Sequence, residues 1–202
     1  MDRAEYWILD AAVEGMWALG TLKPDIVQMA FNRPGHGLSY DALIGLLDRL
    51  FQRGDLVADR VGRLNWEDSH LSVPTREEIV DLLAVVGGPD VWYGLTAQGG
   101  ARWEAVSAPD WERFSDCWWG DPDWWGAVSA DHLRVEQYLS SAKVQSRIVP
   151  GSELWEVVTP WQATYWKTLP IGHKVSFRIT KPKRLMPWAE PAADWYKNYL
   201  LV

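Results

Sequence analysis

Apolar residues recur at helical spacing in three stretches near the start of the chain, with turn residues between them. The first stretch predicts a helix over residues 3–20. The second predicts a short helix over residues 23–30, because a proline, here Pro24, is favoured in a first turn. A third helix follows Ser39, a good N-cap, and ends at Gly54, with an apolar stripe made of Leu43, Ile44, Leu47, Leu50 and Phe51.

The next fifty residues combine strand patterns with two capped helices. Residues 55–60 alternate between apolar and polar as a strand does, and residues 91–95 also fit a strand. Thr75 and Glu78 form a capping box that begins a fourth helix, and Thr96 is placed to cap a fifth. We expect strands 55–60 and 91–96 to pair with each other in one sheet.

The last third of the chain favours strands over helices. Helical periodicity covers residues 130–139, and a final short helix is expected over residues 192–201. Aromatic and β-branched residues predict strands over 153–160 and 163–168. A strictly alternating strand, 174–180, puts its apolar residues on one face and its basic residues on the other. This part therefore predicts a small antiparallel sheet with one or two helices on it.

The segment from Cys117 to Gly126 is dense in tryptophan and contains Gly-Asp-Pro-Asp, a sequence that stops regular structure. The balance of acidic and basic residues changes at the same place. Residues 1–116 hold 10 basic and 19 acidic side chains, whereas residues 117–202 hold 10 basic and 8 acidic ones. We therefore expect two domains, 1–116 and 117–202, with a tryptophan-rich junction between them.

The order of helices and strands up to residue 106, ending in Tyr93-Gly94-Leu95-Thr96-Ala97-Gln98-Gly99, resembles a winged helix-turn-helix domain. The step from wing strand to C-terminal helix is similar to that of MarR-type and PadR-type regulators. The resemblance covers residues 3–106 and implies a fold, since winged helices bind proteins as well as DNA. The predicted fold class is mainly α with a small β component, an N-terminal winged helix joined to a small C-terminal α+β domain.

The composition excludes several cellular locations and several kinds of structural site. No apolar run is long enough to span a membrane, and the first residues lack the form of a signal peptide. The single cysteine of the chain cannot form an internal disulfide or a cysteine-based zinc site. The expected protein is soluble and cytoplasmic, without a membrane, metal or cofactor.

Side chains that could carry catalysis are scattered. Of the four histidines, His36 and His70 lie in loops where solvent exposure is the expected state, and none has another histidine at metal-ligand spacing. Cys117 sits between an acid and two tryptophans, a setting that raises a thiol pKa, so we expect a buried or inert cysteine. There is no phosphate-binding glycine loop. The sequence thus predicts a protein that is not an enzyme.

The fifteen tryptophans are the unusual feature of the composition. Most of them fall on apolar stripes or strands and fit a core, but adjacent pairs around a tight turn cannot all point inward. These pairs either pack the domain junction or anchor a partner, because exposed tryptophan rimmed by acid is typical of binding hot spots. The candidate partner-binding residues are Trp118, Trp119, Trp124 and Trp125, with Asp116, Asp121 and Asp123 as their charged rim.

The net charge of −7 argues against a general DNA-binding surface and suits a basic partner. The expected function is that of a non-catalytic cytoplasmic protein-binding module, an immunity or antitoxin type of inhibitor that occupies a basic partner such as a bacterial toxin. The alternative is a winged-helix transcription regulator that binds DNA.

Overall fold

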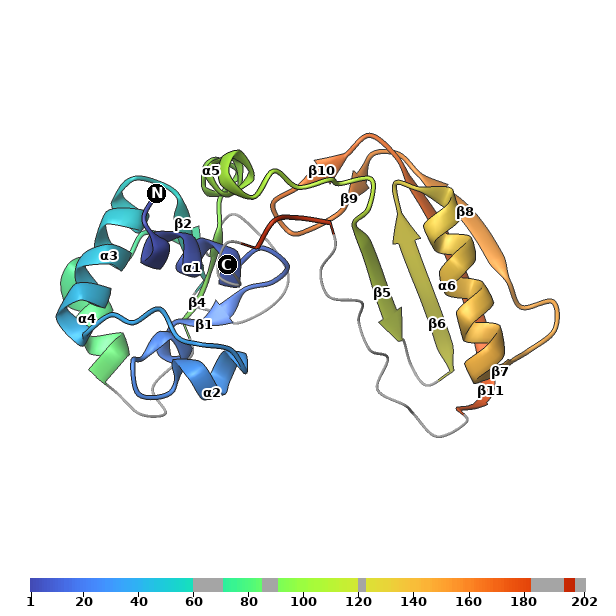
Figure 1. The fold of residues 1–202 in the computed structure, drawn as a ribbon, viewed down its shortest axis with the longest axis horizontal. Coiled ribbons are helices and arrows are strands. Elements are labelled where there is room, and N and C mark those ends of the chain that lie inside the picture. The colour runs from blue at the N-terminus through green and yellow to red at the C-terminus, as the bar shows by residue number, and fades with distance from the viewer. Residues whose placement is uncertain (60–70, 85–90, 120–122, 183–194, 199–202) are drawn as a thin grey trace. The chain divides into compact units, whose positions relative to one another are not determined.

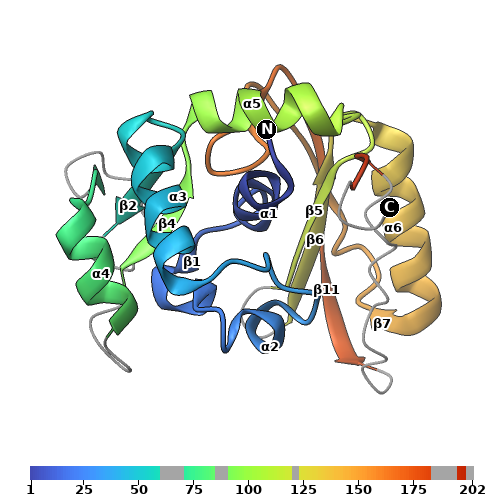
Figure 2. The same cartoon turned by 60° about the vertical axis from the view of Figure 1, so that its left-hand side comes forward.

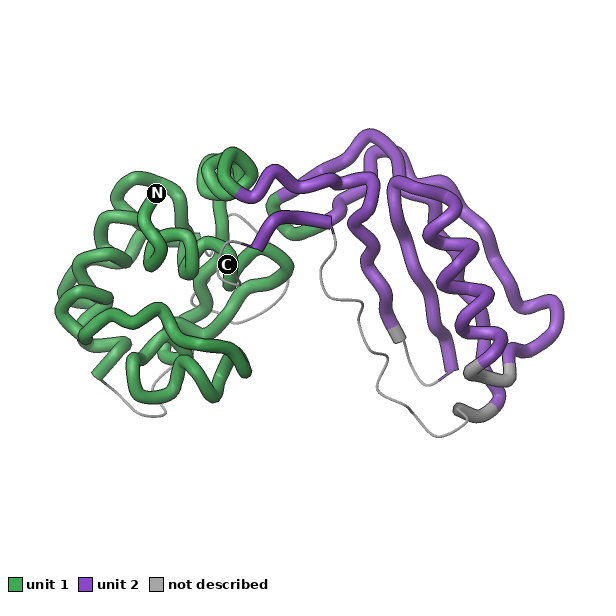
Figure 3. Tube along the Cα trace, viewed as in Figure 1, with its two compact units in different colours: residues 1–106, 164–166, 199–202 green, residues 107–163, 167–198 purple. Residues whose placement is uncertain are grey.

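The computed structural model describes residues 1–59, 71–84, 91–119, 123–182 and 195–198 (Figure 1). They belong to two compact units, shown in different colours in Figure 3. Unit 1 comprises residues 1–106, 164–166 and 199–202, and unit 2 comprises residues 107–163 and 167–198. The first crossing between units thus falls at 106/107, ten residues before the expected domain boundary.

Unit 1 places helices around a four-stranded antiparallel sheet of order β1-β4-β2-β3. Strand β2 pairs with β4 through Leu56 and Leu95 at one end and Asp59 and Trp92 at the other, so the predicted pairing of these two strands is confirmed. The elements of this unit in chain order are α1 (Arg3–Ala11), β1 (Trp17–Ala18), the 3-10 turn η1 (Leu19–Leu22), α2 (Val27–Phe31), α3 (Tyr40–Gln52), β2 (Leu56–Asp59), β3 (Leu71–Ser72), α4 (Arg76–Ala84), β4 (Trp92–Leu95) and α5 (Ala97–Ser107).

Three of these helices begin at the residues that the sequence predicts. The Ser39 Oγ accepts a hydrogen bond from the Ala42 amide at the start of α3. At α4, the Thr75 Oγ1 accepts from the Glu78 amide at 3.2 Å, and a Glu78 carboxylate oxygen accepts from the Thr75 amide at 2.8 Å. The Thr96 Oγ1 accepts from the Gly99 amide at 3.1 Å. Each cap satisfies backbone N–H groups that the helix itself cannot.

The first helix is much shorter than the predicted 3–20, because it ends at Ala11. Trp17 and Ala18 instead form β1, which pairs with Tyr93 and Trp92 of β4, and the Leu19 amide donates to the Val91 carbonyl at 2.7 Å. Strand pairing with a segment more than seventy residues along the chain therefore replaces the helical hydrogen bonds that the local pattern favours.

Residues 164–166 belong to unit 1 although they are distant from it in sequence. The Tyr165 hydroxyl donates to the Ala12 carbonyl and accepts from the Leu95 amide, and the Trp166 Nε1 donates to the Val13 carbonyl at 2.8 Å. Two glycines make room for these rings. A Cβ on Gly94 would lie 2.9 Å from the ring of Tyr165, and one on Gly100 would lie 2.1 Å from that of Trp166.

Unit 2 is built on a five-stranded antiparallel sheet in which β11 is central. Helix α6 runs along one face of this sheet (Figure 2), where Val135, Leu139 and Ala142 pack against apolar residues of β11. The elements in chain order are β5 (Ser115–Trp119), β6 (Trp124–Ser129), α6 (His132–Gln145), β7 (Ser146–Ile148), β8 (Leu154–Val158), β9 (Trp161–Gln162), β10 (Thr168–Leu169) and β11 (Gly172–Pro182).

The expectation of a mainly α protein is wrong. Strands in three antiparallel sheets stand beside the helices, which makes this an α+β fold. The tryptophan-rich segment accounts for much of the difference, because its ends are β5 and β6, paired from Ser115–Ser129 to Trp119–Trp125. Residues 163–168 are predicted as one strand, but residues 163–167 link β9 to β10, which begins at Thr168 and pairs with β9.

The predicted final helix, 192–201, falls mostly outside the described residues, and the described part, 195–198, is not helical. Among the described residues, no helix has both the length and the apolar character needed to cross a membrane.

Candidate binding site

The face of the unit 2 sheet opposite α6 carries the candidate site, which we call the pocket face. Successive side chains of a strand point to opposite faces. Val175 and Phe177 of β11 pack under α6, so Lys174 and Ser176 lie on the pocket face. The strand register carries this alternation to the neighbouring strands, because Lys174 is opposite Val128 of β6 and Ser176 is opposite Gly126.

A pocket of about 460 Å³ opens on this face. Its shape depends on two glycines that let indole rings lie against the sheet. A Cβ on Gly126 would lie 2.2 Å from Trp118, and one on Gly172 would lie 2.6 Å from Trp161. The pocket is lined by Trp118, Trp124, Val128, Val158, Trp161, Lys174 and Ser176.

The charges around the pocket are mixed. The Lys174 Nζ lies 2.7 Å from a carboxylate oxygen of Glu156 and 5.8 Å from the centre of the Trp118 ring. Arg178 lies 3.9 Å from Asp123. Asp116 is exposed as a residue, but desolvation of its carboxyl by surrounding atoms raises the pKa above its ordinary value, against the opposing effect of a hydrogen bond from the Cys117 amide. The pocket thus offers an aromatic wall beside a lysine–glutamate pair.

The structure separates the four predicted anchor tryptophans. Trp118 and Trp124 are half-buried and line the pocket. Trp125 faces the other way and packs against the core under α6. Trp119 is paired with Trp125 through the backbone, and its side chain is not described. Trp125 thus packs in the core of unit 2, whereas Trp118 and Trp124 remain candidates for anchoring a partner.

The predicted acidic rim is divided as well. Asp116 is on β5, opposite Val128, and Asp123 immediately precedes β6 and lies near Arg178. Asp121 is outside the described residues. Sequence reasoning missed Trp161, Val158 and Lys174 as pocket residues. Alternation along 174–180 could have found Lys174, whereas Trp161 reaches the pocket from β9, a strand too short to give a periodic signal.

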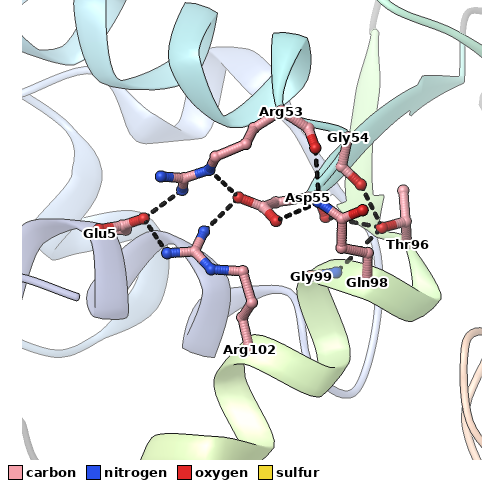
Figure 4. A network of polar contacts seen from close by, with 8 residues as sticks. All are labelled: Glu5, Arg53, Gly54, Asp55, Thr96, Gln98, Gly99 and Arg102. Atoms are coloured by element: carbon pink, nitrogen blue, oxygen red, sulfur yellow. Dashed lines mark hydrogen bonds and ion pairs between the residues drawn. The ribbon is translucent and has the colours of Figure 1, made fainter.

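A second group of charged residues, in unit 1, forms a network between two helices and the turn that connects α3 to β2 (Figure 4). The Arg102 guanidinium contacts the carboxylates of Glu5, at 2.7 Å, and of Asp55. The Arg53 guanidinium contacts the same two carboxylates, with its Nε 2.6 Å from Asp55. The two positive and two negative charges cancel there, and the Arg53 guanidinium is paired with carboxylates of its own unit.

Helix α3 corresponds to the recognition helix in the winged-helix resemblance. Little of its surface presents basic side chains to solvent. Helix α4 packs against it, and Arg76 of α4 lies 3.6 Å from Asp48 of α3. Six of its thirteen residues are buried. Its exposed charged residues are Asp41 and Arg49, and Arg53, just beyond its end, belongs to the network described above.

Two residues differ from their expected surroundings. His36 is buried rather than solvated: its Nδ1 accepts from the Leu38 amide at 3.1 Å, so its Nε2 donates to the Leu22 carbonyl at 2.8 Å. Cys117 is exposed on β5 rather than buried. His70 lies outside the described residues. Within the described part of the chain, no three His, Cys, Asp or Glu side chains are grouped to hold a metal ion.

Comparisons with family models, with curated proteins and with solved structures return no match for this chain.

Proposed function

We propose that this protein is a non-catalytic cytoplasmic binding protein of the immunity or antitoxin kind, and that it acts by occupying a basic protein. The observation that carries the proposal is the pair of half-buried tryptophans, Trp118 and Trp124, held against the pocket face with hydrogen-bonding and charged groups around them. Tryptophan that is partly buried and rigidly seated supplies contact area with little loss of side-chain entropy on binding.

The charge distribution supports a basic partner. Residues 1–116 carry nineteen acids against ten bases, and long-range attraction of this kind raises the rate of encounter with an oppositely charged protein. The pocket face then supplies the anchor, because an apolar or aromatic side chain fits its indole walls and a cationic one can lie over an indole ring.

The first experiment identifies the partner and tests the anchor together. Extracts of the source cell are passed over the immobilised protein and over its Trp118→Ala and Trp124→Ala variants. A protein retained by the wild type is then purified and titrated by calorimetry. We expect a basic protein whose affinity falls at least about thirty-fold with either variant, the size of a binding hot spot. The matched control is Val144→Ala, an exposed site on α6, which should leave the affinity unchanged.

A parallel measurement of melting temperature separates binding from packing. Trp125→Ala should lower the melting temperature, because this ring packs on the α6 core, and should affect affinity only through unfolding. If the Trp118 and Trp124 variants lose stability but keep their affinity, the pocket face is not the partner-binding site.

DNA binding is the second candidate function. It is favoured by the order of α3, β2 and β4, with the predicted strand pairing present, as a winged helix requires. The scarcity of exposed basic side chains on α3 and the internal pairing of Arg53 weigh against it, since base and phosphate contacts need free basic side chains. We therefore propose the protein-binding function first.

A further inference from the structure

Strand β8 forms an edge of the unit 2 sheet, and the hydrogen bonds around β11 show which of its backbone groups face outward. The Ile179 amide donates to the Asp123 carbonyl at 2.9 Å, so Ile179 directs its backbone groups toward the β6 side. Its neighbour Arg178 directs its own groups to the other side, where its carbonyl accepts from the Val149 amide at 2.9 Å and its amide donates to the Ser152 Oγ at 3.0 Å.

This alternation continues along β11, because residues of a strand direct their N–H and C=O groups to the two sides in turn. Lys174, an even-numbered residue like Arg178, therefore forms a hydrogen-bonded pair with its register partner Glu156. The backbone groups of Trp155 and Val157 then point away from β11. Within the described part of the chain, β8 pairs with no strand other than β11, so these groups form a free edge.

Three of the five side chains of β8 are both apolar and exposed, and they lie on both faces of this edge. Leu154 is 57% exposed, Trp155 43% and Val157 59%. Natural edge strands are usually protected by lysine, proline or a bulge, since an apolar edge invites pairing with another strand. None of the five residues of β8 is a lysine or a proline. This edge is therefore built for a partner strand.

We propose that β8 pairs antiparallel with β8 of a second copy of this chain, about a two-fold axis at Glu156. In this register Trp155 faces Val157 of the other copy, twice, with all four residues using their outward backbone groups. On the opposite face Leu154 meets Val158 of the other copy, again twice. Aromatic and β-branched residues are favourable neighbours across an antiparallel pair, and a two-fold interface needs this kind of self-complementarity.

The charges of the edge tolerate this pairing. Glu156 faces its own equivalent at the axis, which by itself is unfavourable. Each Glu156 is, however, already paired with Lys174 at 2.7 Å, and Glu153 is paired with Lys143 at 2.8 Å. Both acids at this edge are thus neutralised within their own copy, and the apolar contacts remain as the net attraction. Val158 of β8 also lines the pocket, but the strand pairing uses the outer edge of β8 and does not involve Trp118 or Trp124.

Disulfide trapping tests the register. Residues facing each other at the axis form a non-hydrogen-bonded pair with Cα atoms about 4.5 Å apart, which a disulfide can bridge. Glu156→Cys is therefore made with Cys117→Ser, so that one thiol remains. We expect mild oxidation to give a covalent dimer. The matched control, Leu154→Cys with Cys117→Ser, has an exposed thiol on the same strand and face, but its register partner is Val158, so it should give no covalent dimer. Equal cross-linking of both variants would overturn the register.

Sedimentation velocity of the full chain tests the pairing itself. We expect a dimer that forms with rising concentration in the wild type and is lost in Val157→Pro. Proline removes an outward N–H that β11 does not use, so the strand itself should remain paired, as circular dichroism can check. If that variant unfolds, Val157→Lys places a charge at the same edge and takes its place. A wild type that stays monomeric and is not trapped through Glu156→Cys would overturn the proposal and leave the edge to a strand of a different protein.

Discussion

Tyr93 and Tyr165 are both packed within unit 1 but differ in what their hydroxyl groups contact. The Tyr165 hydroxyl contacts two backbone groups, Ala12 O and Leu95 N. The Tyr93 hydroxyl is buried and has no hydrogen-bond partner in the described structure. We predict that Tyr165→Phe lowers the free energy of unfolding by about 1–3 kcal/mol, because it leaves buried backbone groups unsatisfied.

Tyr93→Phe is the matched comparison, and it should cost nothing or stabilise the protein, since it removes a buried polar atom without a partner. Urea unfolding of the two variants measures both values. Equal losses in both would show that the Tyr165 hydrogen bonds are not what holds this segment in place.

Two helical glycines, Gly45 and Gly100, differ in the space available for a side chain. Alanine normally stabilises a helix interior by about 1 kcal/mol relative to glycine. Gly45 of α3 has room for it, because a Cβ there would be 3.7 Å from its nearest neighbour, the Arg49 guanidinium. Gly100 of α5 has none, because of the Trp166 ring. We predict that Gly45→Ala raises the melting temperature and Gly100→Ala lowers it. A rise in both would mean that Trp166 moves aside at little cost.

The network of Figure 4 joins α1, α5 and the turn between α3 and β2 through charge. Burial acts to raise the pKa of the Glu5 carboxyl, but the hydrogen bonds and charges of Arg102 and Arg53 together outweigh burial and hold the pKa below its ordinary value of 4.5. A carboxyl with a lowered pKa in the folded state stabilises the fold above its unfolded pKa. This contribution is lost as the pH falls through the folded pKa.

We therefore predict that Glu5→Gln is less stable than the wild type by about 2 kcal/mol at neutral pH, since the variant removes one of the two carboxylates that the Arg53 and Arg102 guanidinium groups share. The difference should stay constant down to about pH 4.5 and shrink below it. Chemical unfolding from pH 7 to pH 3 checks this. A difference that does not depend on pH would assign the loss to packing instead of charge.

The sequence predicts an element well when the interactions that define the element are local in the chain. Capping residues act within three positions, so Ser39, Thr75 and Thr96 could be identified directly. The first helix could not be bounded in the same way, because residues 17–18 are held by β4, far along the chain. Trp118 and Trp124 could be chosen from composition, but only the strand register shows that Trp125 faces the opposite side.

For the whole molecule, we predict weak DNA binding, because the net charge is −7 and the Arg53 guanidinium is already paired with carboxylates of the chain. Selection from a random duplex pool should return no discrete operator in the range typical of specific sites, about 10⁻⁸ to 10⁻¹¹ M at physiological salt. An operator in that range, lost with Arg49→Ala and retained with Arg76→Ala, would establish the regulator function instead.

The place of Tyr165 and Trp166 in unit 1 also bears on synthesis of the chain. A ribosome completes residues 1–106 and must then add about sixty more before these two rings exist, a delay of roughly 3–12 s at ordinary elongation rates. Until then the grooves over Gly94 and Gly100 are unfilled, and the carbonyls of Ala12 and Val13 lack these partners. The N-terminal unit therefore cannot finish folding in the order in which it is translated, and a nascent chain paused before residue 164 presents an unfinished surface to chaperones.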